Sequence, residues 1–158
     1  MTSNQPSVID DSNFTVSRTI SIAAAPEKVW AAITETDHIV KWFGDHAVLD
    51  RVAVGGSGLF GFEGYGDFAV RIEELDEPRM IAYRWSNDNA KAGDPAGGEF
   101  SKSTVFRFTL EPIPTGTRLT VVETGFDTLS DPAASMEGNR QGWDGELDEL
   151  VAYLEGEA

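Results

Sequence analysis

The chain has 158 residues and carries 27 acidic against 12 basic side chains, a net charge of -15. This length predicts one domain, and so negative a surface repels nucleic acids and anionic membranes. The absence of cysteine excludes disulfides, thiol nucleophiles and Cys-ligated metals. No stretch approaches the ~18 consecutive apolar residues of a membrane span, and no basic, apolar secretory leader begins the chain. We therefore expect a cytoplasmic domain without nucleic-acid or membrane partners.

The first residues are polar and unpatterned, so residues 1–12 are expected to be a disordered leader before a domain that spans residues 13–158. Apolar and polar side chains then alternate over residues 14–22. A period of two is typical of a half-buried strand. Arg18 occupies the apolar phase of this strand and is its one exception.

Two short helices are predicted after the first strand. Pro26 is suited to a first helical turn because its missing N–H needs no partner there, and Trp30 belongs to the buried stripe that follows. A second helix begins near Thr36 and carries Trp42. Gly44 ends it.

Residues 45–125 alternate between short apolar runs and turn signals, a pattern typical of antiparallel hairpins. The breaks include a glycine-rich turn at residues 55–58 and a polar loop at residues 86–98. The predicted strands are residues 47–52, 59–62, 67–73, 80–85, 104–110 and 118–122. With the first strand they number seven.

A long amphipathic helix is predicted for residues 132–155, where apolar side chains fall on one stripe at 100° per residue and an Asp-Pro pair marks the start. Gly138, Gly142 and Gly145 each weaken the helix by about 1 kcal/mol relative to alanine. We expect them to make the first half irregular or to allow a close backbone contact. Arg140 lies on the apolar stripe.

This order of elements predicts an α+β fold. A curved, seven-stranded antiparallel sheet must bury one face, and one long helix with a short helical pair is available to cover it. Because a single helix does not fill the concave side of a curved sheet, we expect an apolar cavity between the two.

The segment RTISIAAAPEKVWAAITETDHIVKWFG, residues 18–44, contains Ala25-Pro26, Val29-Trp30 and Trp42. Later in the chain come Gly55-Gly56-x-Gly58, residues 116–126 and Gly142-Trp143. In order and spacing these motifs resemble the family of activators of heat shock protein 90 ATPase (AHSA1-like), within the START/Bet v 1-like superfamily, and residues 18–44 are similar to its opening. The resemblance implies a helix-grip fold. It implies much less about function, because one fold serves many functions.

Three charged residues occupy apolar phases. In the topology that the resemblance implies, the first and last strands are neighbours, so we hypothesise an ion pair between Arg18 and Glu123 beside the cavity. The pair is either a structural contact near the sheet end or a polar anchor for a ligand. Arg140 either extends its guanidinium to solvent or binds a carboxylate or phenolate in the cavity mouth.

The favoured function is non-enzymatic binding of a small apolar or aromatic ligand. The alternatives are a co-chaperone that stimulates a heat-shock-protein ATPase and an aromatase/cyclase-like enzyme that uses the cavity. No catalytic residue, cofactor or metal is predicted, and the chain is expected to be a monomer or a homodimer. The predicted ligand-binding residues are Trp30, Trp42, Phe60, Phe68, Tyr83, Trp85, Phe106, Arg140, Trp143 and Leu147, with Arg18 and Glu123 as polar candidates.

Overall fold

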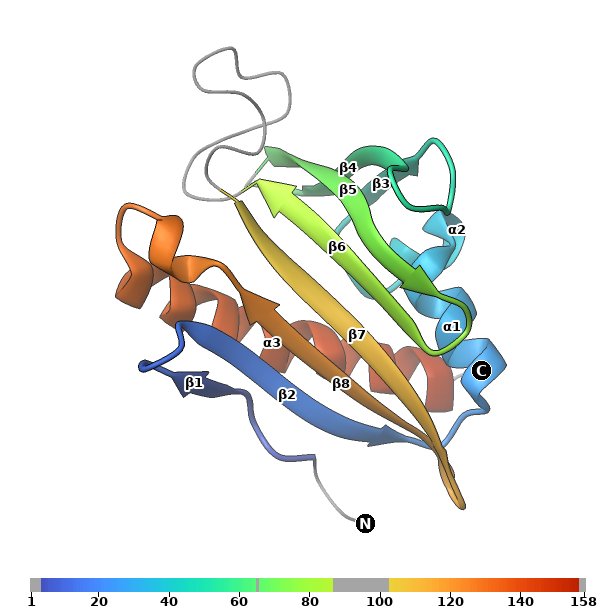
Figure 1. The fold of residues 1–158 in the computed structure, drawn as a ribbon. Coiled ribbons are helices and arrows are strands. Elements are labelled where there is room, and N and C mark those ends of the chain that lie inside the picture. Colours follow the sequence, from blue (N-terminus) through green and yellow to red (C-terminus); the bar gives the residue numbers. More distant parts are fainter. Residues whose placement is uncertain (1–3, 65, 87–102, 157–158) are drawn as a thin grey trace.

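One antiparallel sheet and three α-helices make up the computed structural model, which describes residues 4–64, 66–86 and 103–156 (Figure 1). The strands are β1 (Val8–Asp10), β2 (Thr15–Ile22), β3 (His46–Leu49), β4 (Ser57–Phe62), β5 (Gly66–Asp76), β6 (Met80–Ser86), β7 (Ser103–Ile113) and β8 (Gly116–Thr124). The helices are α1 (Pro26–Thr34), α2 (Thr36–Ile39), the 3₁₀ turn η1 (Phe126–Thr128) and α3 (Pro132–Glu155). The sheet order is β1-β2-β8-β7-β6-β5-β4-β3. The predicted α+β class is therefore confirmed.

The described sheet has eight strands, not the expected seven. The additional strand is β1, which lies within the segment expected to be a disordered leader and pairs Ile9 with Val16 of β2. Two polar contacts hold the residues before it: Ser7 N donates to Asp144 Oδ1 at 2.7 Å, and Arg18 Nε donates to the carbonyl of Gln5 at 2.8 Å. The strand thus depends on partners far along the chain, which its own short pattern does not reveal.

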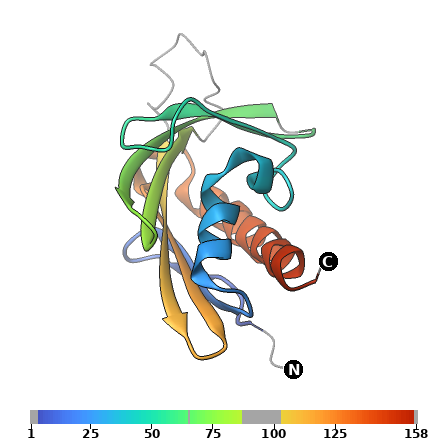
Figure 2. The ribbon, with the colours of Figure 1, turned by 90° about the vertical axis from the view of Figure 1, so that its right-hand side faces the viewer.

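All three α-helices lie on the concave side of the sheet. Figure 2 shows the sheet curving around them, and Figure 1 shows α3 crossing behind β8 and β7. Alternate side chains of the strands point to this side and are buried against the helices, as a period of two requires. The core includes Val16, Ile20, Val29, Ile33, Ile72, Ile81, Phe108, Leu119, Val121 and Leu147.

The predicted neighbourhood of the first and last strands is confirmed, because β2 pairs with β8. In the register of this pair, Arg18 lies opposite Val121 and Glu123 lies opposite Val16. Both charged side chains are buried, with 5% and 0% exposure. They therefore share the helix-facing side of the sheet.

Helix α3 is continuous from Pro132 to Glu155, and its N-cap is Asp131, whose Oδ1 accepts a hydrogen bond from Ala134 N at 3.2 Å. The expected irregularity at its glycines is wrong. A close backbone contact is also absent there, since a Cβ added at Gly138, Gly142 or Gly145 would meet no atom within 4 Å. Packing of the buried side chains of α3 against the sheet stabilises the helix despite these glycines; the buried residues are Met136, Trp143, Leu147 and Leu150.

Two further sequence expectations concern the polar loop and a membrane span. The polar loop predicted at residues 86–98 lies outside the described residues, except for Ser86, which is the buried last residue of β6. Among the described helices, none has the length and apolar character needed to cross a membrane.

Candidate functional site

A cavity of about 250 Å³ lies between α3 and the strands β4, β5 and β6. Five aromatic rings make up most of its wall, and Gly142, which is exposed, places part of its rim at the surface. The lining residues are Phe43, Phe62, Phe68, Trp85, Ser86, Asn139, Gly142, Trp143 and Glu146. The expected cavity between sheet and helix is thus present, at one end of the concave face.

Phe43 connects the two sides of the cavity. It follows α2 and stacks on Trp143 of α3 with ring centroids 5.8 Å apart and planes 16° apart, and it also contacts Phe62 of β4 at 5.2 Å. Gly44 makes this position possible: its φ is +74°, and a Cβ there would lie 2.5 Å from the carbonyl oxygen of Gly61. Helix α2 ends at Ile39, so the prediction that Gly44 ends it is wrong. Gly44 instead lets the chain that follows Phe43 pass close to β4.

A fully buried carboxylate lies behind the aromatic wall. Glu123 Oε1 accepts a hydrogen bond from Trp143 Nε1 at 2.8 Å, and its Oε2 accepts from Trp85 Nε1 at 3.0 Å. Thr104 Oγ1 donates to Oε2 at 2.5 Å, and Asn139 Nδ2 lies 3.1 Å from both oxygens. Three of these four donors come from residues that line the cavity. Glu123 therefore fixes the orientation of the wall without lining it.

Burial raises the pKa of Glu123 above its ordinary value, and the hydrogen bonds from Thr104, Trp85, Trp143 and Asn139 oppose that rise. Desolvation is the larger effect. The buried acid is thus costly to ionise, and each of its donors offsets part of that cost.

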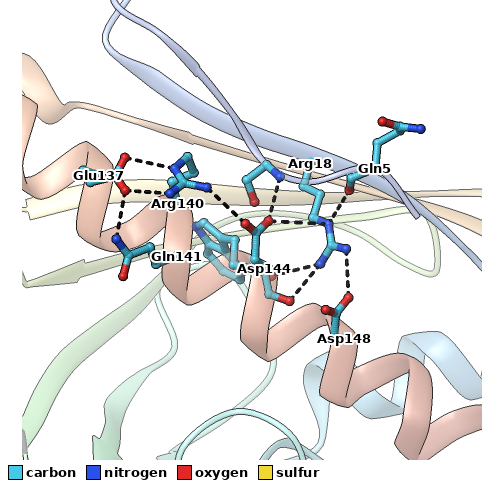
Figure 3. Close-up of polar contacts among 9 residues, drawn as sticks. Gln5, Arg18, Glu137, Arg140, Gln141, Asp144 and Asp148 are labelled. Atoms are coloured by element: carbon cyan, nitrogen blue, oxygen red, sulfur yellow. Dashed lines mark hydrogen bonds and ion pairs between the residues drawn. The ribbon is translucent and has the colours of Figure 1, made fainter. Parts of the chain in front are cut away.

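The predicted ion pair between Arg18 and Glu123 is wrong. Arg18 donates instead to the carbonyl of Asp144 at 3.0 Å and to Asp148 Oδ1 at 2.8 Å, and its Nε lies 3.9 Å from Asp144 Oδ1 (Figure 3). Helix α3 lies over β2 and presents these carbonyl and carboxylate oxygens to the guanidinium, while Glu123 is occupied by other donors. Arg18 therefore fastens α3 to the sheet.

Arg140 does not line the cavity. Its guanidinium contacts Glu137 Oε2 at 2.6 Å and Asp144 Oδ2 at 3.2 Å, on the flank of α3 that faces Arg18 (Figure 3). Helical spacing of three and four residues brings these two acids to it. The interpretation in which Arg140 binds a ligand anion is not supported by this position.

The remaining predicted residues separate into three groups. Phe68, Trp85 and Trp143 line the cavity. Trp42, Phe60, Tyr83 and Phe106 surround a void of only about 10 Å³ deeper in the core. Trp30 and Leu147 are buried but line neither space.

Sequence reasoning missed six lining residues: Phe43, Phe62, Ser86, Asn139, Gly142 and Glu146. A usable signal existed for two of them. Asn139 and Glu146 lie four residues before and three residues after Trp143, so they share its face of the helix. Phe62 and Ser86 end their strands, where the position of the cavity depends on the curvature of the sheet.

Glu146 is the ionisable residue among the described residues that line the cavity. Its pKa is raised to about 7, first by partial burial and then by the negative charges of Glu149 and Asp45. A carboxyl group with such a pKa changes its protonation state near neutral pH. The rim charge of the cavity therefore depends on pH.

The curved sheet that holds a long helix above a cavity defines a helix-grip domain. The chain belongs to the family described as Activator of Hsp90 ATPase homolog 1-like protein, whose model matches residues 23–155. No curated protein matches the chain.

Solved structures share the fold. The protein MLL2253 of Mesorhizobium loti is 28% identical, with a TM-score of 0.75 over 89% of this chain and 96% of its own. DynU16, from the dynemicin biosynthetic locus, is 22% identical with a TM-score of 0.70, over 89% of this chain and 47% of its own. The Aha1 dimer of Colwellia psychrerythraea is 21% identical with a TM-score of 0.69, over 89% and 96%. The fold supports a ligand-binding or cyclase-like domain in general.

Proposed function

We propose that the protein binds a small apolar or aromatic molecule, without chemical change, in the cavity between α3 and strands β4 to β6. The observation that carries the proposal is the cavity wall, in which five aromatic rings surround about 250 Å³. A concave, mostly apolar space with a few polar groups is the usual form of a small-molecule site.

The wall is held in place before any ligand arrives, which favours binding. Trp85 and Trp143 are bonded through their indole N–H groups to Glu123, and Phe43 is stacked on Trp143. Rings fixed in this way lose little conformational freedom when a ligand is bound, so less of the interaction energy is spent on ordering them. Aromatic faces and edges also suit a flat apolar guest.

A cyclase-like enzyme is the second candidate, and Glu146 is the observation that favours it. A carboxyl group with a pKa of about 7 beside an apolar cavity has the protonation balance of a general acid or base. The solved relative DynU16 comes from a biosynthetic locus, which is compatible with this reading.

The co-chaperone alternative is supported by the description of the family and by the Aha1 relative. The Aha1 relative is a dimer, which also supports a dimer of this chain.

Binding is tested with N-phenyl-1-naphthylamine, a neutral apolar fluorophore, and with Gly142→Leu as the blocking variant. A leucine at residue 142 would extend into the cavity, since Gly142 lines it and has free space at its Cβ. We expect saturable binding to the wild type and at least about tenfold weaker binding to the variant.

The matched control is Gly138→Leu, which places the same side chain four residues earlier on α3. Gly138 has equal space but does not line the cavity, and helical side chains tilt toward the N-terminus, away from it. This variant should bind the fluorophore like the wild type. Equal binding by both variants and the wild type, or no binding by any of them, would reject the cavity as the binding site.

A further inference from the structure

The charge at the cavity is negative. Among the nine lining residues that the structure describes, Glu146 is the single ionisable side chain, and Ser86 and Asn139 are neutral. Asn139 directs its amide toward Glu123. The polar chemistry available to a ligand at the rim is therefore that of a carboxylate.

Within the described part of the chain, Glu146 forms no hydrogen bond or ion pair. The charged groups that act on it are themselves acidic: Glu149 on α3 and Asp45 in the turn before β3. The arginines that neighbour lining residues in sequence are engaged elsewhere, since Arg84 pairs with Glu73 and Arg140 pairs with Glu137. Glu146 thus lacks a counter-charge among these residues.

The aromatic rings beside the Glu146 carboxylate also favour a positively charged ligand. The faces of Trp, Tyr and Phe attract cations through their quadrupole, and Trp does so most strongly. Trp85 and Trp143 line the same cavity as Glu146, together with three phenylalanines. Their indole N–H groups are committed to Glu123, so what remains for a ligand is mainly the π surface.

We infer that the ligand is an organic cation: an ammonium group on an apolar or aromatic body, with Glu146 as its counter-charge and the aromatic wall as its cage. This inference rests on the proposed binding function and specifies the class of ligand. A carboxylate-bearing ligand of the same size would be repelled by Glu146, Asp45 and Glu149. The net charge of -15 acts in the same direction.

Three probes with one skeleton separate charge from shape: 4-phenylbutylamine, 4-phenylbutanol and 4-phenylbutyrate, titrated calorimetrically at pH 8.5 and low salt. We expect the amine to bind at least about tenfold more tightly than the alcohol, the range of a partly desolvated cation–π contact with a charge partner. The carboxylate should bind most weakly. Lowering the pH to 6 should reduce the preference for the amine, because Glu146 becomes protonated while the amine stays charged.

Glu146→Gln keeps the shape of the rim and removes its charge, so it should abolish most of the preference for the amine. The control is Glu149→Gln, which removes a neighbouring charge from a residue that does not line the cavity and should keep most of it. Equal affinity for amine and alcohol in the wild type, or a preference that survives Glu146→Gln, would overturn the inference while leaving apolar binding intact. Failure of all three probes together with N-phenyl-1-naphthylamine would instead overturn the proposed function.

Discussion

Trp143 Nε1 donates a 2.8 Å hydrogen bond to Glu123 Oε1, and this bond joins α3 to β8 through a fully buried acid. Trp85 brings β6 to the same carboxylate, and Thr104 brings β7. Four elements of the fold therefore share one pair of oxygen atoms. The Glu123 carboxylate therefore contributes both to the stability of the sheet and to the shape of the cavity wall.

Glu123→Ala is expected to lower the free energy of unfolding by about 3 kcal/mol, because it removes the acceptor of four donors. Among these is the buried Trp143 Nε1, and a buried donor left unpaired costs about 1–3 kcal/mol. Glu123→Gln should destabilise the fold less, because glutamine keeps one of the two acceptor oxygens. Some loss remains, because the NH₂ group of glutamine would face the N–H and O–H donors that bonded to the other oxygen. Urea unfolding measures both. Glu111→Ala, an exposed acid in β7, is the control and should change stability by under about 0.5 kcal/mol. A Glu123→Ala protein as stable as this control would contradict the assigned role.

Arg18→Lys should destabilise the fold by about 2 kcal/mol, because lysine cannot reproduce the fork that bonds Gln5, Asp144 and Asp148 at once. Thermal unfolding gives the change. The same substitution at Arg118, an exposed residue whose partner is Glu111, should have little effect, since exposed ion pairs contribute under about 1 kcal/mol. Similar losses at both positions would argue against the special contribution of Arg18.

Gly138→Ala and Gly142→Ala should each raise the stability of α3 by up to about 1 kcal/mol, because both residues are helical and a Cβ meets no atom within 4 Å at either. The melting temperature measures this gain. The two variants differ only in place: the methyl group at residue 142 enters the cavity and the one at residue 138 does not. A loss of stability at either position would mean that the space beside the helix is occupied.

Glu146→Gln should stabilise the protein at pH 8 by about 1 kcal/mol after allowance for solvent screening, and should have little effect at pH 5. The pKa of Glu146 is about 7 in the folded protein, above the ordinary value of 4.5. The folded state therefore binds the proton more tightly than the unfolded state, and the wild type loses stability as the pH rises from about 4.5 through 7. Unfolding measured at both pH values tests the sign. A stabilisation that is the same at both would contradict the raised pKa.

Much of the fold follows from local patterns. The alternation in β2 and the glycine-marked hairpins indicate antiparallel strands, and the stripe on α3 indicates one long helix despite three glycines. The missed strand β1 shows the limit of such patterns. It has three residues, and the segment before it is held by Asp144 of α3, 137 residues away from Ser7.

The site was predictable in kind but less so in detail. Two of the three charged residues in apolar phases mark buried polar contacts with α3, since Arg18 and Glu123 both face that helix. Their partners could not be read from the strands, because these depend on where α3 lies along β2 and on which indole N–H groups reach Glu123. The lining residues Trp85 and Trp143 could be predicted because they occupy inward phases. The rim residue Glu146 requires knowledge of which side of α3 faces the cavity.

The two flanks of α3 make different contacts. Asp144 and Asp148 bind Arg18 on one flank, while Gly142 and Glu146 border the cavity on the other. A substitution at residue 142 or 146 therefore leaves the attachment of the helix intact while it changes the volume or charge offered to a guest. The volume and charge of the cavity can therefore change along this architecture while the contacts that attach α3 to the sheet stay the same.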